Sequence, residues 1–158
     1  MGYTLTRFND LMSQMTPPVH TFSLSRPLPG ESASACWERL VEFERWPSWN
    51  PGLRKANCTP AGESGRGSVL AVETNSGRKL VWSIAHWEPQ VKIAFIVRNR
   101  FFQSAWCFEF PADSAPGERR LKLEMELQCK PGAGLLLWWL RWSLRRRANR
   151  FLDCLCSE

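Results

Sequence analysis

Alternating apolar and polar residues predict an antiparallel β-sheet through the middle of the chain. The clearest alternation runs from 119 to 130, where the apolar positions are Leu121, Leu123, Met125, Leu127 and Cys129. Charged or polar residues stand between them, which is typical of a strand with one buried face and one solvated face. Shorter runs bounded by turn residues predict further strands at 20–28, 53–59, 68–74, 79–87, 91–98 and 101–110.

Two helices are expected beside these strands. The first begins near Ser32, a favourable N-cap residue, and ends before Pro47. The second runs from Gly134 to about Cys156 without a helix-breaking residue. Its apolar stripe, at helical spacing, consists of Leu136, Leu137, Leu140, Leu144, Ala148, Phe151 and Leu155.

These elements predict an α+β fold in which a curved antiparallel sheet of about six to seven strands wraps around a long C-terminal helix. A twisted sheet with one apolar face needs a cover, and only the C-terminal helix, at ~1.5 Å per residue, is long enough. A curved sheet and a straight helix do not meet along their whole length. We therefore expect a ligand cavity between them.

The length of 158 residues fits a single domain. We expect residues 1–19 to form an N-terminal arm and residues 20–158 to form one ligand-binding domain. Nine Trp and nine Phe against one Tyr supply apolar area with few hydroxyl groups. The six Cys are scattered, no apolar run reaches the ~20 residues of a membrane span, and the N-terminus has no secretory signal. These features predict a cytoplasmic protein with reduced thiols.

Several segments, in this order, resemble the SRPBCC superfamily of START-like helix-grip proteins, and specifically its polyketide cyclase/dehydrase-like branch. Residues Ala35–Leu40 look like the family pattern A-x-x-V-W-x-x-L, and the rigid aromatic segment Trp46–Pro51 follows. Gly67 opens a strand, and Trp82-Ser83-Ile84 leads into Glu88-Pro89 much as in the family. The closing helix also ends as in family members, at Asp153–Glu158.

The resemblance covers roughly residues 20–158 and implies a hydrophobic cavity between sheet and helix. Members of the superfamily receive lipids, polyketides, hormones or aromatic compounds, and they include carriers, cyclases and regulators. The main hypothesis is therefore binding or transport of a small hydrophobic ligand. Two alternatives stay open: a polyketide cyclase/dehydratase-type enzyme, and a protein-interaction module that uses the outer face of the C-terminal helix.

Large inward-facing side chains are the expected ligand-binding residues. They are Trp82, Ile84, Phe95, Trp106, Phe108, Leu123, Met125, Leu140 and Leu144. Their rings either line a pocket or fill the volume themselves, and the sequence does not decide between the two. His86 alternates in phase with Trp82 and Ile84, so it is the candidate for an acid–base group in the cavity. A structural, hydrogen-bonded histidine is the alternative.

No cofactor or metal is expected. The two histidines and the pair Cys154 and Cys156 lack zinc-ligand spacing, and no glycine-rich phosphate loop is present. The formal net charge is +6, and arginines follow Trp138 and Trp142 on the C-terminal helix. We expect Trp138, Trp142, Arg145 and Arg146 to lie off the apolar stripe. They form either a solvated face, a contact with a homodimer partner or the N-terminal arm, or a transient contact with a membrane surface. Nucleic acid is not an expected partner.

Overall fold

The computed structural model describes residues 19–28, 33–59, 65–98, 102–111, 119–129 and 134–157. The expected N-terminal arm, apart from Val19, and the expected N-cap Ser32 lie outside these residues.

Seven strands form a single antiparallel sheet. They are β1 (Val19–Pro27), β2 (Leu53–Thr59), β3 (Val69–Thr74), β4 (Lys79–Glu88), β5 (Lys92–Arg98), β6 (Phe102–Glu109) and β7 (Arg120–Cys129). Their order across the sheet is β1-β7-β6-β5-β4-β3-β2. Strands β2 to β7 form a meander in chain order. Strand β1 pairs with β7, so it covers the free edge of β7 and is itself the edge strand of the sheet.

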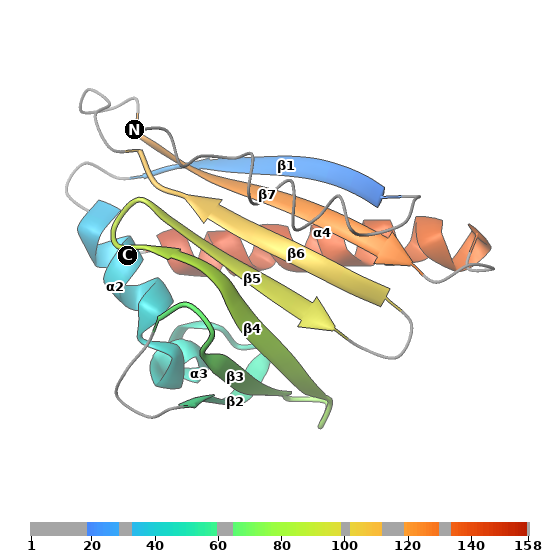
Figure 1. Cartoon of the computed structure of the whole chain (residues 1–158), viewed down its shortest axis with the longest axis horizontal. Helices are drawn as coiled ribbons and strands as arrows, with labels where there is room; N and C mark the ends of the chain where they lie inside the picture. The colour runs from blue at the N-terminus through green and yellow to red at the C-terminus, as the bar shows by residue number, and fades with distance from the viewer. Residues whose placement is uncertain are drawn as a thin grey trace.

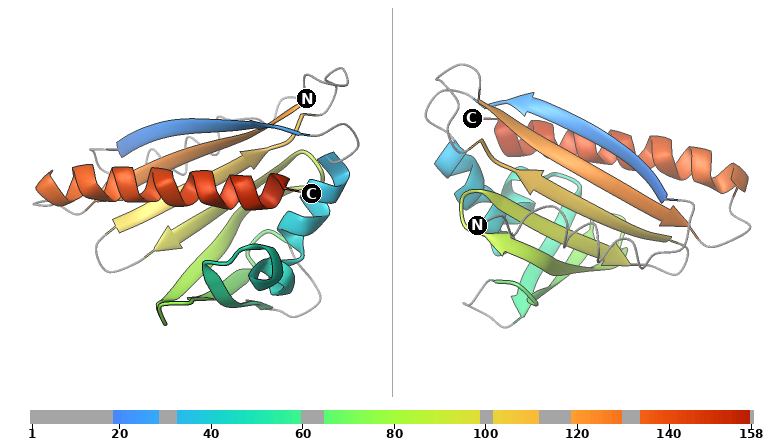
Figure 2. Two further views of the ribbon diagram at one scale, coloured as in Figure 1. Left: turned by 180° about the vertical axis from the view of Figure 1, so that it is seen from behind. Right: turned by 45° about the horizontal axis from the view of Figure 1, so that its top comes forward.

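The helices lie on one side of this sheet. They are α2 (Ala33–Val41), the 3₁₀ turn η1 (Phe43–Arg45), the short α3 (Trp46–Trp49) and the long α4 (Gly134–Cys156). Figure 1 shows α4 behind the sheet, and Figure 2 shows from the other side that it crosses the concave face while α2 and α3 stand at one end. The predicted helix-grip arrangement is confirmed, and α4 has the predicted bounds.

The alternation of the strands sorts the side chains between the two faces of the sheet. On β7, Leu121 to Leu127 place an apolar residue in the core at every second position, whereas Lys122, Glu124 and Glu126 point to the opposite, convex face. The same alternation on β4, β5 and β6 gives the concave face a continuous apolar surface, and this surface is what α4 covers.

The C-terminal half of α4 is held by hydrogen bonds to two other elements. Arg26, at the end of β1, donates to Asp153 Oδ1 (2.6 Å) and to Asn149 Oδ1 (2.7 Å). Arg39 of α2 donates to the carbonyl oxygen of Leu155 (3.1 Å). These bonds satisfy acceptors near the helix C-terminus and fix its position on the sheet.

None of the described helices is long and apolar enough to cross a bilayer. All six cysteines are free thiols.

Candidate functional site

The structure brings the nine predicted ligand-binding residues into one hydrophobic core. Seven come from β4, β5, β6 and β7, and Leu140 and Leu144 come from the face of α4 that lies over them. All nine are buried, none by less than nine-tenths of its surface. Whether these side chains bind a ligand stays a prediction, since a core position and a binding position are equally buried.

At the end of the interior near α3, aromatic rings contact one another directly. The ring of Phe151 on α4 lies 5.4 Å from Trp46, 5.7 Å from Phe108 and 6.2 Å from Trp106, measured between centroids. Most of these contacts are edge-to-face, the arrangement that aromatic pairs favour. This end of the interior is therefore filled by the chain's own rings.

The pairing register places polar groups in one row across the concave face. His20 on β1 is opposite Leu127, and Leu127 is opposite Ser104. Ser104 is in turn opposite Val97, which is opposite Trp82 on β4. Neighbouring strands are ~4.8 Å apart, so His20, Ser104 and Trp82 follow one another at intervals of about 10 Å. We call these three residues the polar row.

Two members of the polar row have buried nitrogen atoms without a partner. Trp106 Nε1 donates to Ser104 Oγ at 3.1 Å. By contrast, Trp82 Nε1 and His20 Nε2 are buried and find no hydrogen-bond partner among the residues that the structure describes. Such an atom costs ~1–3 kcal/mol, and in a native protein it points to water or to a ligand atom. The polar row thus offers one indole donor and one imidazole nitrogen to a molecule in the interior.

The position of His20 relative to α4 follows from the end contacts of β1. Strand β1 and helix α4 run side by side and in the same direction (Figures 1 and 2). Because Arg26 at the far end of β1 contacts Asn149 and Asp153, His20 lies toward the N-terminal half of the helix. Leu140 and Leu144, which are buried on that half, face the same interior.

His86 does not face this interior, so the expectation that it shares a face with Trp82 and Ile84 was wrong. A β-bulge falls between Ile84 and His86: Ile84 is opposite Phe95, whereas His86 is opposite Ala94. Phe95 and Ala94 are consecutive and point to opposite faces, so the bulge moves His86 to the convex side. There its Nε2 lies 3.7 Å from Glu88 Oε2. The sequence signal could not show the extra residue that reverses the alternation.

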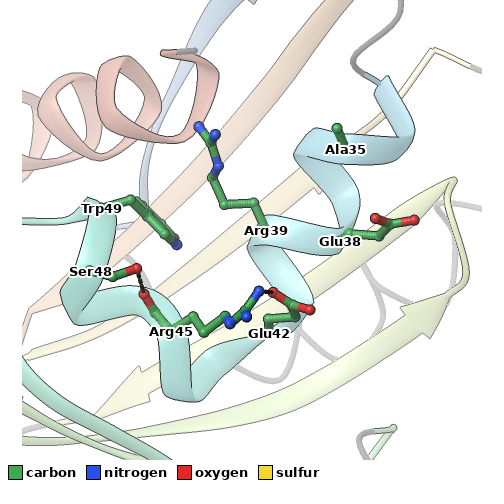
Figure 3. Close-up of a pocket in the computed structure, with 7 residues that line it drawn as sticks. All are labelled: Ala35, Glu38, Arg39, Glu42, Arg45, Ser48 and Trp49. Atoms are coloured by element: carbon green, nitrogen blue, oxygen red, sulfur yellow. Dashed lines mark hydrogen bonds and ion pairs between the residues drawn. The ribbon is translucent and has the colours of Figure 1, made fainter.

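A pocket of about 330 Å³ opens between α2 and α3, and its lining is polar. In Figure 3, Trp49 faces this pocket from α3, while Arg39 reaches toward the end of α4. Arg45 pairs with Glu42 at 3.0 Å on the pocket wall. The indole nitrogen of Trp49 is buried and has no hydrogen-bond partner within the described part of the chain, and its ring lies 5.2 Å from that of Phe151. Trp49 therefore separates the pocket from the aromatic interior.

Two thiols meet where the C-terminal end of α4 reaches α2. A hydrogen bond with Cys156, together with burial, raises the pKa of Cys36, and the same bond lowers the pKa of Cys156. Cys36 Sγ also lies 3.8 Å from the carbonyl oxygen of Leu155. Of these two thiols, Cys156 therefore has the greater thiolate character.

Acidic groups are arranged away from the polar row. The carboxylates on the strands, namely Glu73, Glu88, Glu109, Glu124 and Glu126, all stand at convex-face positions of the register. Burial, followed by the nearby charge of Glu124, raises the pKa of Glu126. Within the described ranges no three His, Cys, Asp or Glu side chains gather as metal ligands.

A curved antiparallel sheet closed by one long helix over an apolar concave face defines a helix-grip protein of the START-like type. The sequence profile of one family, described as polyketide cyclase / dehydrase and lipid transport, matches residues 20–155, and the chain belongs to this family. No curated protein matches the sequence significantly.

Three solved structures illustrate the shared fold. The chain superposes on Ara h 8.0201 with a TM-score of 0.67 at 15% identity, covering 87% of this chain and 96% of that one. For a START superfamily protein from Mycobacterium smegmatis the TM-score is 0.65 at 17% identity, covering 87% and 97%. For the di-domain ARO/CYC StfQ from the steffimycin biosynthetic pathway it is 0.73 at 15% identity, covering 87% of this chain and 49% of that protein. At these identities the likeness establishes the fold alone.

Sequence reasoning missed His20 and Ser104 as site residues. His20 is in phase with Phe22, Leu24 and Arg26, so the alternation of its strand did contain the signal that it faces inward. Ser104 falls in the same alternation as Trp106 and Phe108. What the sequence lacked was the pairing of β1 with β7, which puts His20 into the row that leads to Trp82.

Proposed function

We propose that this protein binds a small, largely apolar molecule beneath α4, with a hydrogen-bond acceptor of that molecule at Trp82 Nε1. The observation that carries the proposal is the indole N–H of Trp82, which is buried in a largely apolar interior and has no partner among the described residues. Burial of apolar ligand area supplies most of the affinity, and the indole sets the orientation. The family description, which includes lipid transport, supports the same ligand class.

The bound molecule has to displace side chains, because the ring of Trp82 contacts those of Trp46, Trp106 and Phe151. The aromatic contacts around Phe151 fill the end of the interior that contains Trp82. Leu140 and Leu144 belong to the same buried core, and an unbranched or flat apolar group enters such a core with smaller rotamer changes than a bulky one. A lipid chain, a polyketide or an aromatic compound has the required shape and chemistry.

Binding is the function that the arrangement supports better than catalysis. A cyclase needs at least two proton-transfer groups that reach one another. In the part of the chain that the structure describes, the strand carboxylates stand on the convex face, and His20 and Ser104 are separated by an intervening strand.

We place the protein in the cytoplasm, because six free thiols suit a reducing compartment.

A matched pair of variants tests the proposal with dansyl-labelled undecanoic acid as the probe. Trp82→Phe removes a donor that the ligand is expected to use, whereas Trp106→Phe removes a donor already bound to Ser104. Both substitutions leave a ring in the same core. We expect Trp82→Phe to weaken probe binding by about threefold to tenfold, the range of one hydrogen bond, and Trp106→Phe to change it by less than about twofold.

Fluorescence titration of the dansyl group measures both affinities, and circular dichroism shows that both variants are folded. Equal affinities for the two variants would remove Trp82 from the binding site. Failure of the wild-type protein to bind the probe, together with the absence of any co-purified apolar molecule in native mass spectrometry, would contradict the proposed function itself.

A further inference from the structure

We propose that the outer face of α4 docks on the surface of an anionic lipid membrane. This inference goes beyond ligand binding and does not depend on it. The face consists of Trp138, Trp139, Trp142, Arg145 and Arg146, which we call the Trp/Arg face. Trp138 is 75% exposed and Trp142 is 51% exposed, as the sequence predicted from their position opposite the apolar stripe.

The geometry of α4 gathers these residues on one side of the helix. At 100° per residue, Arg145, Trp138, Trp142 and Arg146 fall within an arc of about 100°. Figure 2 shows α4 lying over the concave face of the sheet, and the exposure of these four side chains places the arc on the side of the helix turned away from the sheet. The guanidinium carbon of Arg146 lies 5.5 Å from the centre of the Trp142 ring, a cation–π distance.

The charged residues of α4 are almost all positive. Its described residues include five exposed arginines: Arg141, Arg145, Arg146, Arg147 and Arg150. The one acidic residue of the helix, Asp153, is held by Arg26 at the far end. The Trp/Arg face is therefore a cationic surface with no carboxylate of its own, and its complement is an anionic surface.

An anionic bilayer suits both the indole rings and the arginines of the Trp/Arg face. Indole rings settle at the level of the lipid headgroups, where their apolar body and polar N–H are both accommodated. Arginines on the same helix face attract anionic headgroups. A second copy of the chain would instead bring two uncompensated sets of arginines together, and the phosphates of a nucleic acid would leave three indoles without an apolar partner.

Co-sedimentation with lipid vesicles tests this inference. We expect the wild-type protein to bind vesicles of phosphatidylcholine mixed with phosphatidylserine and to bind pure phosphatidylcholine weakly. Each basic residue near an anionic surface strengthens binding about fivefold, so the double variant R145Q/R146Q should bind roughly 25-fold more weakly. The matched double variant R66Q/R78Q removes the same charge from exposed sites outside α4 and should bind within about threefold of wild type.

Other outcomes would overturn the inference. Equal losses in the two double variants would show a response to net charge alone, and absence of binding to anionic vesicles would remove the membrane as partner. A wild-type dimer in light scattering that Trp138→Glu dissociates would assign the face to a second copy. Tighter retention on an oligonucleotide than on vesicles would assign it to nucleic acid. Because Trp82→Phe leaves the Trp/Arg face intact, it should bind vesicles normally even if it loses the ligand probe.

Discussion

Trp46→Ala is expected to lower the free energy of unfolding by about 3–5 kcal/mol. The side chain of Trp46 is fully buried, and its indole N–H donates to the carbonyl oxygen of Leu40 at 2.9 Å. Its ring contacts those of Trp82 (5.4 Å) and Phe151 (5.4 Å), so it joins α3 to both the sheet and α4. Truncation leaves a cavity, an unpaired carbonyl group and several rings without their partner.

Chemical denaturation with urea measures this loss, and Trp142→Ala is the matched control. The control makes the same substitution at a half-exposed position on α4, where the cost should stay within about 0.5 kcal/mol. If both variants lose the same stability, the aromatic cluster around Trp46 does not hold the three elements together.

Phe151→Ala is expected to destabilise the protein by a similar ~3–5 kcal/mol and to open the interior to small aromatic guests. Phe151 is the residue of α4 whose ring contacts both Trp82 and Trp106 on the sheet, so its removal leaves an apolar void beside the polar row. Apolar cavities of this kind stay dry and bind aromatic molecules such as benzene. Added toluene should therefore raise the melting temperature of this variant by more than that of the wild type, in which the ring of Phe151 occupies the space.

Differential scanning fluorimetry with and without toluene checks the second prediction, and Phe151→Leu serves as its control. Leucine keeps most of the volume, so this control should lose about 1–2 kcal/mol and gain little from toluene. No response of Phe151→Ala to toluene would mean that the interior collapses around the missing ring and does not retain an open space. An equal rise in both variants would mean that toluene does not bind in the space that the ring leaves.

The strands and α4 were predictable because their patterns are long and regular. The alternation on β7 buries its apolar residues together only in a strand. The unbroken run from Gly134 to Cys156 does so only in a helix. The fold class followed, since one long helix is the only available cover for a sheet with a single apolar face. The exposure of Trp138 and Trp142 was predictable because the helical period places both residues opposite the apolar stripe of α4.

The candidate site was less predictable because it depends on register. The bulge after Ile84 reverses the side of His86 and nothing in the local composition marks it. His20 joins Ser104 and Trp82 only through the pairing of β1 with β7, two segments about 100 residues apart in the chain. Which rings fill the interior is likewise a property of packing in three dimensions, because aromatic side chains that line a cavity and those that fill it have the same sequence pattern.

The indole N–H resonances in a ¹H–¹⁵N NMR spectrum test ligand binding under α4 most directly. On titration with dansyl-labelled undecanoic acid, the Trp82 signal, assigned by its loss in Trp82→Phe, should move downfield as its free N–H gains an acceptor. The Trp106 signal, whose N–H already bonds Ser104, should move much less. A spectrum in which the Trp82 signal stays fixed while only exposed indoles such as Trp138 respond would contradict an internal binding site.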